Sequence, residues 1–166
     1  MAHSLRLSSL SRCVQKWNSW GQEQTQQMAR PHIFEPLLRS GAGCYRLINR
    51  TKGVVLAEAV ETAFDSRSRR TGLLGRDALG EDAVLAIAPS NAVHTIGMRF
   101  PIDVLFITRT GRVTRRVQRL RPLRVAASLP AFAVLEFAAG HPAVAVTAVG
   151  DHVAIDISPA HADLMP

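Results

Sequence analysis

Cysteine, lysine and long apolar runs are all scarce in this sequence, and each scarcity excludes a class of structure. The 166 residues include two cysteines, Cys13 and Cys44, whose spacing fits neither a zinc site nor a disulfide framework. We expect both to be free thiols. No apolar stretch reaches the roughly 18 residues that cross a bilayer, because Arg, Asp, Glu or Pro interrupts each one. We therefore expect no membrane insertion.

Recognisable catalytic and nucleotide-binding motifs are also missing. The sequence contains no Gly-x-Ser-x-Gly nucleophile elbow and no phosphate loop of the Gly-x-x-x-x-Gly-Lys or Gly-x-Gly-x-x-Gly type. Hydrolase and nucleotide-binding functions therefore lose most of their support. From the residues alone we assign no catalytic residue, no metal ligand and no cofactor.

Residues 1–44 show no sustained periodicity and are rich in Ser, Gln, Gly and Pro. We expect them to form a poorly ordered basic leader with one short helix near residues 5–17. The leader lacks the continuous apolar segment of about 7 to 15 residues that defines a secretory signal, so the default location is the cytoplasm. Two alternatives stay open: a basic, serine-rich organelle transit peptide, and translation from Met28.

Residues 45–157 are expected to form a single β domain, followed by a flexible tail at 158–166. Short runs rich in Val, Ile and Phe alternate with turn sequences. Two hairpins are predicted, one joining 45–49 to 54–60 and the other joining 102–108 to 112–120. Further strands are predicted at 83–88, 93–98, 131–138, 143–149 and 152–157. This spacing favours a mainly β fold, either a compact antiparallel β-sandwich or a partly open barrel.

One short helix is expected near residues 66–74. Asp65 or Ser66 can accept hydrogen bonds from the first free backbone amides of such a helix. The leucines at its end can dock it on the core, and Gly75 then allows the chain to leave in a left-handed conformation.

The predicted strand at 93–98 carries a histidine and a methionine among apolar residues. Because side chains alternate along a strand, His94, Ile96 and Met98 are expected on one face. A histidine and a methionine can bind a soft metal, but a metal site needs more ligands than this pair supplies. A core histidine with one hydrogen bond is the favoured interpretation.

Two carboxylates occupy apolar strands. Asp103 precedes the apolar run 104–107, and Glu136 interrupts the apolar run 132–138. Burying a carboxylate costs several kcal/mol unless it is paired, so each is expected to have an arginine partner. The candidate partners are Arg70, Arg76 and Arg99. A structural salt bridge is favoured, although two carboxylates in different environments can also act as general acid and base.

The segment 109–124 is strongly basic, with seven arginines and no acid. Strand alternation places Arg115 and Arg119 on the face of Val113 and Val117, and splits the charge between two faces. A dedicated phosphate-binding surface would gather its arginines on one face and interleave aromatic residues. A solvated sheet edge is therefore favoured, with weak, non-specific nucleic-acid contact that is lost near physiological ionic strength. The arginines concerned are Arg112, Arg115, Arg116 and Arg119.

Three groups of motifs follow one another along the β domain: RTGLLGR at 70–76, HTIGMRFPIDVLFI at 94–107, and VLE at 134–136 followed by AG at 139–140 and GD at 150–151. In this order and spacing they resemble the bacterial and archaeal family known as domain of unknown function 192. The resemblance implies a compact β-sandwich-like domain, sometimes carried by secreted or membrane-anchored proteins. It implies no enzymatic activity and carries no established catalytic residues. Many relatives have an aromatic-Met-Lys-Asn-Thr pattern before Pro-Leu-Asp, where this sequence reads IGMRFPID over 96–103.

Polar residues set among apolar strands give the best candidate for a functional site. We expect a non-enzymatic binding or accessory domain that recognises a small ligand or a protein partner. The expected ligand-binding residues are His94, Met98, Arg99, Asp103 and Glu136. The alternative is a small hydrolase or metal-dependent enzyme that uses His94, Asp103 and Glu136.

Overall fold

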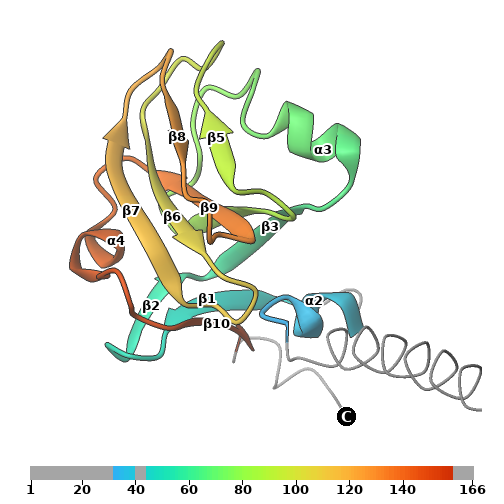
Figure 1. The fold of residues 1–166 in the computed structure, drawn as a ribbon, viewed down its shortest axis with the longest axis vertical. Helices are drawn as coiled ribbons and strands as arrows, with labels where there is room; N and C mark the ends of the chain where they lie inside the picture. The colour runs from blue at the N-terminus through green and yellow to red at the C-terminus, as the bar shows by residue number, and fades with distance from the viewer. Residues whose placement is uncertain (1–31, 40–43, 159–166) are drawn as a thin grey trace, which may run out of the picture. The chain divides into compact units, whose positions relative to one another are not determined.

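A five-stranded sheet forms the centre of the fold, with its strands in the order β3-β4-β9-β6-β7 (Figure 1). The computed structural model describes residues 32–39 and 44–158. The strands are β3 (Ala59–Ala63), β4 (Ala83–Ile87), β6 (Ile102–Ile107), β7 (Val113–Leu120) and β9 (Ala133–Ala138). Neighbours are antiparallel except β3 and β4, which are parallel. β6 and β9 are almost wholly apolar because both faces of the sheet are covered.

Two smaller sheets complete the β structure of the described residues. β1 (Tyr45–Asn49) lies between β2 (Val54–Ala57) and β10 (Val153–Ile157) in an antiparallel three-stranded sheet. β5 (Ala92–His94) and β8 (Val125–Ala127) form a short antiparallel ribbon. The prediction of a mainly β fold is confirmed.

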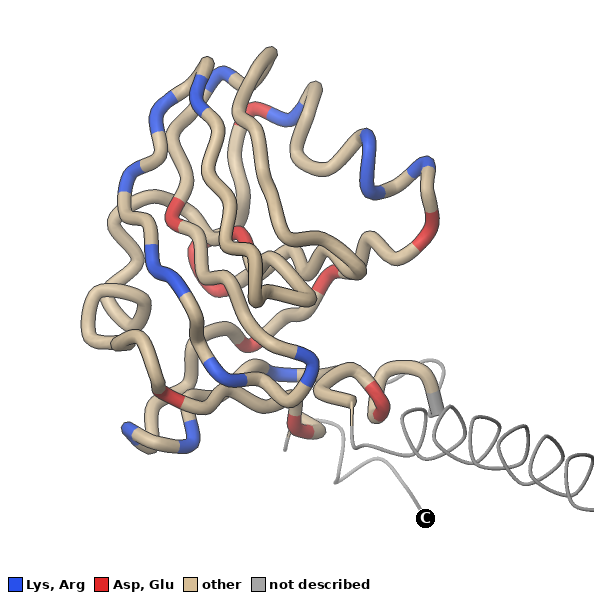
Figure 2. The backbone as a smooth tube through the Cα atoms, viewed as in Figure 1, with Lys and Arg blue, Asp and Glu red and all other residues tan. Residues whose placement is uncertain are grey.

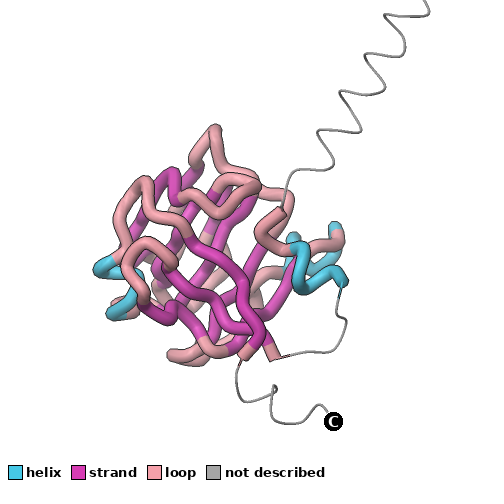
Figure 3. Tube along the Cα trace, turned by 90° about the horizontal axis from the view of Figure 1, so that it is seen from below, coloured by secondary structure: helices cyan, strands magenta, loops and turns pink. Residues whose placement is uncertain are grey.

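Three short helices lie around the strands within residues 32–39 and 44–158 (Figure 3). They are α2 (Glu35–Arg39), α3 (Ser66–Thr71) and α4 (Pro142–Val146). α3 confirms the helix predicted near 66–74. Asp65 caps it, and hydrogen bonds from the Ser68 hydroxyl and from the backbone amides of Ser68 and Arg67 lower the pKa of Asp65 to about 2. The helix ends earlier than predicted because Gly72 takes a φ of +48°.

The central sheet separates two hydrophobic clusters. The first core cluster lies between the central and three-stranded sheets and includes Phe34, Leu47, Leu56, Leu105, Ile107, Leu135 and Phe137. The second core cluster lies on the opposite face, under residues 73–79 and the β5–β8 ribbon, and includes Leu73, Leu85, Met98, Ile102, Val104, Phe106 and Val134. Alternation along β9 sends successive residues to the two clusters in turn. Each side chain of β9 therefore lies either on the side of the first core cluster or on the side of the second.

The folded part of the described chain begins before the predicted boundary at residue 45. Phe34 is 1% exposed, and it is buried with Ile33 in the first core cluster. The Ile33 N–H donates to the carbonyl of Arg109 (3.0 Å). Residues 32–39 therefore pack on the β domain. The helix predicted near 5–17 and the tail residues 159–166 lie outside the described residues.

Two further predictions, on the cysteines and on membrane-spanning segments, can be compared with the described residues. Cys44 is an exposed free thiol, as predicted, whereas Cys13 lies outside the described range. Among residues 32–39 and 44–158, the structure contains no helix that is long and apolar enough to cross a membrane.

Both predicted hairpins are present, as β1–β2 and β6–β7. The strand predicted at 54–60 is divided, because β2 ends at Ala57 and residues 59–60 belong to β3 of the central sheet. Gly111 turns the second one with a φ of +87°, and a Cβ atom there would lie 2.2 Å from the carbonyl oxygen of Val153. Such an approach is sterically impossible, so β10 can lie against this turn only because residue 111 is a glycine.

A β-bulge in β7 overturns the predicted alternation along that strand. Val113 lies opposite Ile107, but Arg115 lies opposite Phe106, so β7 contains one extra residue at this point. Val113 consequently faces the first core cluster, whereas Val117 packs against the second. The prediction that Val113 and Val117 share a face is wrong.

The prediction of a strand at 143–149 is also wrong, because residues 142–146 form α4 and residues 147–149 belong to no strand. Alternating Ala and Val are typical of a strand, but Pro142 occupies the first helical turn, where its missing N–H costs nothing. Arg116 stabilises the other end, where its guanidinium donates to the carbonyls of Ala145 and Thr147 (2.5 and 2.6 Å). Contacts distant in sequence thus override the local strand preference.

The strand predicted at 93–98 is wrong beyond His94, where β5 ends. Thr95 turns inward, and its hydroxyl donates to the carbonyl of Arg121 (2.6 Å). Ile96 is 54% exposed and Met98 is buried, so His94, Ile96 and Met98 do not share a strand face. β8, which pairs with β5, has no counterpart among the predicted strands.

Candidate functional site

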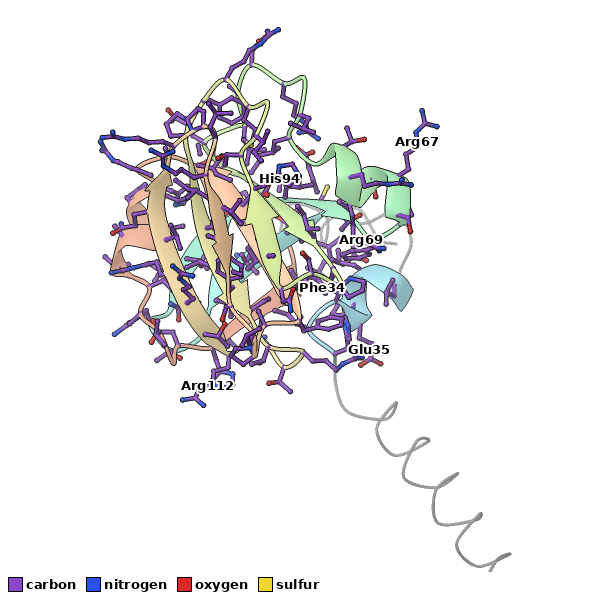
Figure 4. All side chains as sticks on the ribbon, turned by 45° about the horizontal axis from the view of Figure 1, so that its top comes forward. Phe34, Glu35, Arg67, Arg69, His94 and Arg112 are labelled. Carbon is purple, nitrogen blue, oxygen red and sulfur yellow. The ribbon has the colours of Figure 1, made fainter. Side chains whose placement is uncertain are left out.

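A cavity of about 470 Å³ opens on the face of the central sheet that carries the second core cluster. Arg69 and His94, which border it, are labelled in Figure 4. Its walls are α3 with the residues that follow it, the end of β4, and β5. Glu136 from β9 and Met98 from the turn after β5 complete the lining. This volume lies within the range of roughly 300 to 1,000 Å³ that ligand-binding pockets occupy.

The register of β9 places Glu136 in this cavity. Glu136 lies opposite Leu85 of β4 and Val104 of β6, and both of those side chains belong to the second core cluster. Residues directly opposite each other in a sheet share a face, so the carboxyl group of Glu136 projects to the same side. The side chain is 3% exposed.

The carboxyl group of Glu136 is buried without a full set of contacts. Its Oε2 atom has no hydrogen-bond partner within residues 32–39 and 44–158. Burial raises the pKa of Glu136 to about 7, against a smaller lowering by the charge of Arg76. The guanidinium of Arg76 forms its ion pair with Glu61 instead (2.8 Å). The predicted arginine salt bridge of Glu136 is therefore absent from the described part of the chain.

The two arginines of α3 that line the cavity differ in what they bind. The guanidinium of Arg69 donates to the carbonyls of Phe64 and Ala88, which hold it against the ends of β3 and β4. Arg70 donates through Nε to the carbonyl of Ser66 (3.0 Å). Its two terminal nitrogens have no hydrogen-bond partner among the described residues, so Arg70 can bind a group that enters the cavity.

His94 and Met98 reach the cavity from the two ends of one turn. His94 is the last residue of β5 and is exposed at the cavity, whereas Met98 is buried, and its N–H donates to the carbonyl of Thr95 (3.2 Å). Gly97, with a φ of +85°, closes this turn, and a Cβ atom there would lie 3.3 Å from Leu74 in the cavity wall. The turn therefore fits closely against the segment after α3.

Asp103 lies outside this cavity, on the opposite face of the central sheet. It is opposite Phe137, a member of the first core cluster. Its carboxylate accepts hydrogen bonds from the backbone amides of Arg119 (2.7 Å), Gly140 (3.0 Å) and His141 (3.0 Å). The expected arginine partner is replaced by these amides. Asp103 thus fastens the end of β7 to the turn between β9 and α4.

Arg99 also lies away from the cavity lining. Its guanidinium is 2.7 Å from the carboxylate of Asp77, and these side chains are 74% and 85% exposed. Exposed ion pairs of this kind contribute about 0 to 1 kcal/mol to stability. Arg99 therefore forms a surface contact.

The structure brings together three of the five residues that the sequence analysis proposed for a site. These three are His94, Met98 and Glu136. The cavity also contains Arg69 and Arg70, which that proposal omitted. A signal existed for Arg70, which opens the RTGLLGR motif at 70–76 that contributes to the family resemblance, whereas Arg69 lies just before that motif.

A metal site has no geometric support in the part of the chain that the structure describes. No three His, Cys, Asp or Glu side chains there form a group that could hold a metal ion. The proposed enzymatic set of His94, Asp103 and Glu136 does not converge, because Asp103 faces the first core cluster.

The four arginines predicted to contact nucleic acid lie on or beside β7 (Figure 2). Arg115 donates to the carbonyl of Ala127 (2.6 Å), and Arg116 donates to the end of α4. These two arginines lie opposite Phe106 and Leu105, so they leave opposite faces of the sheet. Both side chains hold neighbouring segments in place, and nucleic-acid contact stays a prediction.

The geometry defines a small, mainly β domain with a ligand-sized cavity against its central sheet. The chain belongs to the family known as domain of unknown function 192, described as "Uncharacterized ACR", whose sequence profile matches residues 47–155. The family membership predicted from the three groups of motifs is thereby confirmed.

Two solved structures resemble this fold. A candidate transcription regulator from Sinorhizobium meliloti 1021 is 24% identical, with a TM-score of 0.58, over 67% of this chain and 91% of that one. A protein of unknown function from Novosphingobium aromaticivorans DSM 12444 is also 24% identical, with a TM-score of 0.54, over 66% of this chain and 82% of that one. At this identity the likeness shows the fold alone. No curated protein matches the chain.

Proposed function

We propose that the domain binds a small organic ligand in the cavity beside α3, and that Glu136 recognises a hydrogen-bond donor of that ligand. The observation that carries this proposal is the buried Oε2 atom of Glu136, which has no hydrogen-bond partner among the described residues. Buried polar groups are nearly always hydrogen-bonded, and a partner is missing here at a point that borders a cavity. A donor carried by a ligand would satisfy it.

The cavity suits an organic molecule more than an ion. Leu73, Ile87 and Met98 give it apolar walls, while Glu136 provides a single acidic group among the described lining residues. Ligand pockets commonly combine mostly apolar walls with a few polar groups that fix orientation. An amine is the donor that gains most, because a bound ammonium group would favour the ionised carboxylate.

The pKa of Glu136 favours a second candidate function. A carboxyl group with a pKa of about 7 can accept or donate a proton at neutral pH, as a general base or acid does. An enzyme of this kind would convert the molecule that the cavity binds, rather than bind it only. Ligand conversion in the presence of the wild-type protein and not of Glu136→Gln would support this second function.

Fragment binding tests the proposal directly. We expect fragments that carry a primary amine to shift the backbone amide resonances of residues around the cavity, including Gly72 and Met98. Matched fragments without the amine are expected to bind at least tenfold more weakly. Glu136→Gln should remove most of this preference, whereas Glu81→Gln, at an exposed position outside the cavity, should leave it unchanged. Equal binding to wild type and Glu136→Gln would refute the role of Glu136.

A further inference from the structure

We propose that the ligand is a zwitterion, whose ammonium group binds Glu136 inside the cavity and whose anionic group binds Arg70 at the cavity mouth. This inference rests on the proposed function and names the class of ligand. The nearest examples are small aliphatic amino acids with an unbranched spacer between the two charged groups.

The distribution of charge around the cavity separates two ends. Glu136 is 3% exposed and projects from the sheet, so its carboxyl group lies at the inner end. Arg70 comes from α3, is exposed, and borders the same cavity. A ligand that reaches both residues therefore contacts the carboxyl group of Glu136 in the interior and the guanidinium of Arg70 near solvent.

Arg70 differs from the neighbouring arginines in being both positioned and available. The guanidinium of Arg69 donates to the carbonyls of Phe64 and Ala88. Nε of Arg70 is held by the carbonyl of Ser66, while its terminal nitrogens have no partner in the described chain. A guanidinium held by one nitrogen retains the planar pair of donors that matches a carboxylate or a phosphate.

Two hydroxyl groups that line the cavity, those of Thr71 and Ser90, offer less to an anion. The Thr71 hydroxyl donates to the carbonyl of Arg67 (3.1 Å), and the Ser90 hydroxyl donates to that of Ala92 (2.8 Å). Their protons already have acceptors within the described structure. The guanidinium of Arg70 is therefore the favoured donor for the anionic end.

Apolar side chains occupy the space between the two charged ends. Leu73, Ile87 and Met98 line the cavity without offering a strong hydrogen bond. A spacer of methylene groups would bury its apolar surface against them, so affinity should rise with each methylene that the cavity accommodates. The length of the best spacer then reports the separation between Glu136 and Arg70.

Arg67 provides a matched control on the same helix. It points away from the body of the domain in Figure 4, and it does not line the cavity. Arg67→Gln and Arg70→Gln therefore remove the same charge from the same short helix. A ligand in the cavity should respond to the second substitution and not to the first.

Binding of glycine, β-alanine, 4-aminobutyrate and 6-aminohexanoate, each paired with the unbranched amine of equal carbon number, tests the inference. The full chain would be titrated at pH 8 and low salt, and dissociation constants would be taken from amide chemical shifts. We expect one of the amino acids to bind at least fivefold more tightly than its amine. Arg70→Gln should bring the two within twofold, and Arg67→Gln should preserve the difference.

The outcomes separate this inference from the proposed function. If amines bind as tightly as the amino acids, and Arg70→Gln changes neither, the zwitterion is excluded while the role of Glu136 stands. If neither series binds the wild type, both proposals fail. Thermal melts of each variant distinguish lost binding from lost folding, since a surface substitution such as Arg70→Gln should melt with the wild type.

Discussion

Glu136 and Asp103 lie on adjacent strands of the central sheet, yet their carboxyl groups occupy opposite faces. Asp103 is opposite Phe137 in the register of β6 and β9, so it is one position out of step with Glu136. Asp103 accepts three hydrogen bonds from backbone amides, whereas Oε2 of Glu136 accepts none from the described residues. One carboxylate is therefore held by the backbone of the fold, and the other is the group that the proposed ligand would bind.

Asp103→Asn should destabilise the domain by about 3 kcal/mol, because an amide cannot replace a carboxylate that accepts three hydrogen bonds. Urea denaturation at pH 7 measures the change. Asp77→Asn, which alters an exposed ion pair, is the control and should stay within about 0.5 kcal/mol of wild type. Equal stability of the two variants would show that the amides find other acceptors.

Glu136→Gln should stabilise the domain relative to wild type at neutral and higher pH, whereas Asp103→Asn should destabilise it. The folded-state pKa of Glu136 is about 7 and its ordinary value is 4.5, so between these values the unfolded chain ionises first. The wild type should lose about 3 kcal/mol of stability as pH rises from 4.5 to 7. Glu136→Gln should lack this loss and become relatively more stable towards pH 8.

Urea denaturation of both proteins at several pH values measures this effect. The difference between them isolates Glu136 from other groups that titrate in the same range. His32 is one of these, because burial and the charge of Arg109 lower its pKa despite the opposing charge of Glu35. Parallel stability curves for wild type and Glu136→Gln would contradict the raised pKa.

Phe34→Ala should cost about 3 to 5 kcal/mol, because Phe34 is 1% exposed and fills part of the first core cluster. Leu38→Ala, at a position in α2 that is 66% exposed, should change stability by less than about 0.5 kcal/mol. Thermal or urea denaturation of the full chain measures both. A small effect at Phe34 would mean that the β domain starts at residue 45, as the sequence pattern indicates.

Arg116→Ser should destabilise the domain by about 1 to 2 kcal/mol, because the carbonyls at the end of α4 lose a charged donor. Arg121→Ser, at an exposed position beyond β7, serves as the control. The comparison is also a control for nucleic-acid binding assays, because weaker binding by Arg116→Ser could result from lost folding and not from a lost contact. Equal melting of the two variants would contradict the capping role.

The parts of the fold that sequence predicts are those with an unambiguous local signal. The runs 102–107 and 133–138 are short, apolar and rich in Val, Ile and Phe, which favours buried strands, and Asp65 before a helix is a strong capping signal. The motifs that carry the family resemblance contain Met98 and Arg70, but the segment with Met98, predicted as a strand, forms a turn after β5.

The remaining features depend on register and on partners distant in sequence. The bulge between Val113 and Arg115 changes which side chains enter the core, and alternation alone has no means of revealing it. The helix at 142–146 depends on Arg116, more than twenty residues earlier. The separation of Asp103 from Glu136 follows from strand pairing, so the candidate site could be predicted only in part.

The parallel pairing of β3 with β4 has a consequence for the cavity. A tight turn joins antiparallel strands, so the chain between β3 and β4 has to return along the sheet before it can pair again. Residues 64–82 make that return, and they carry α3 and much of the cavity wall. Strand direction thus imposes a covering over Glu136. Shortening residues 64–82 to a hairpin turn would abolish the parallel pairing, so substitutions, rather than deletions, are the changes that can alter this wall while the sheet is kept.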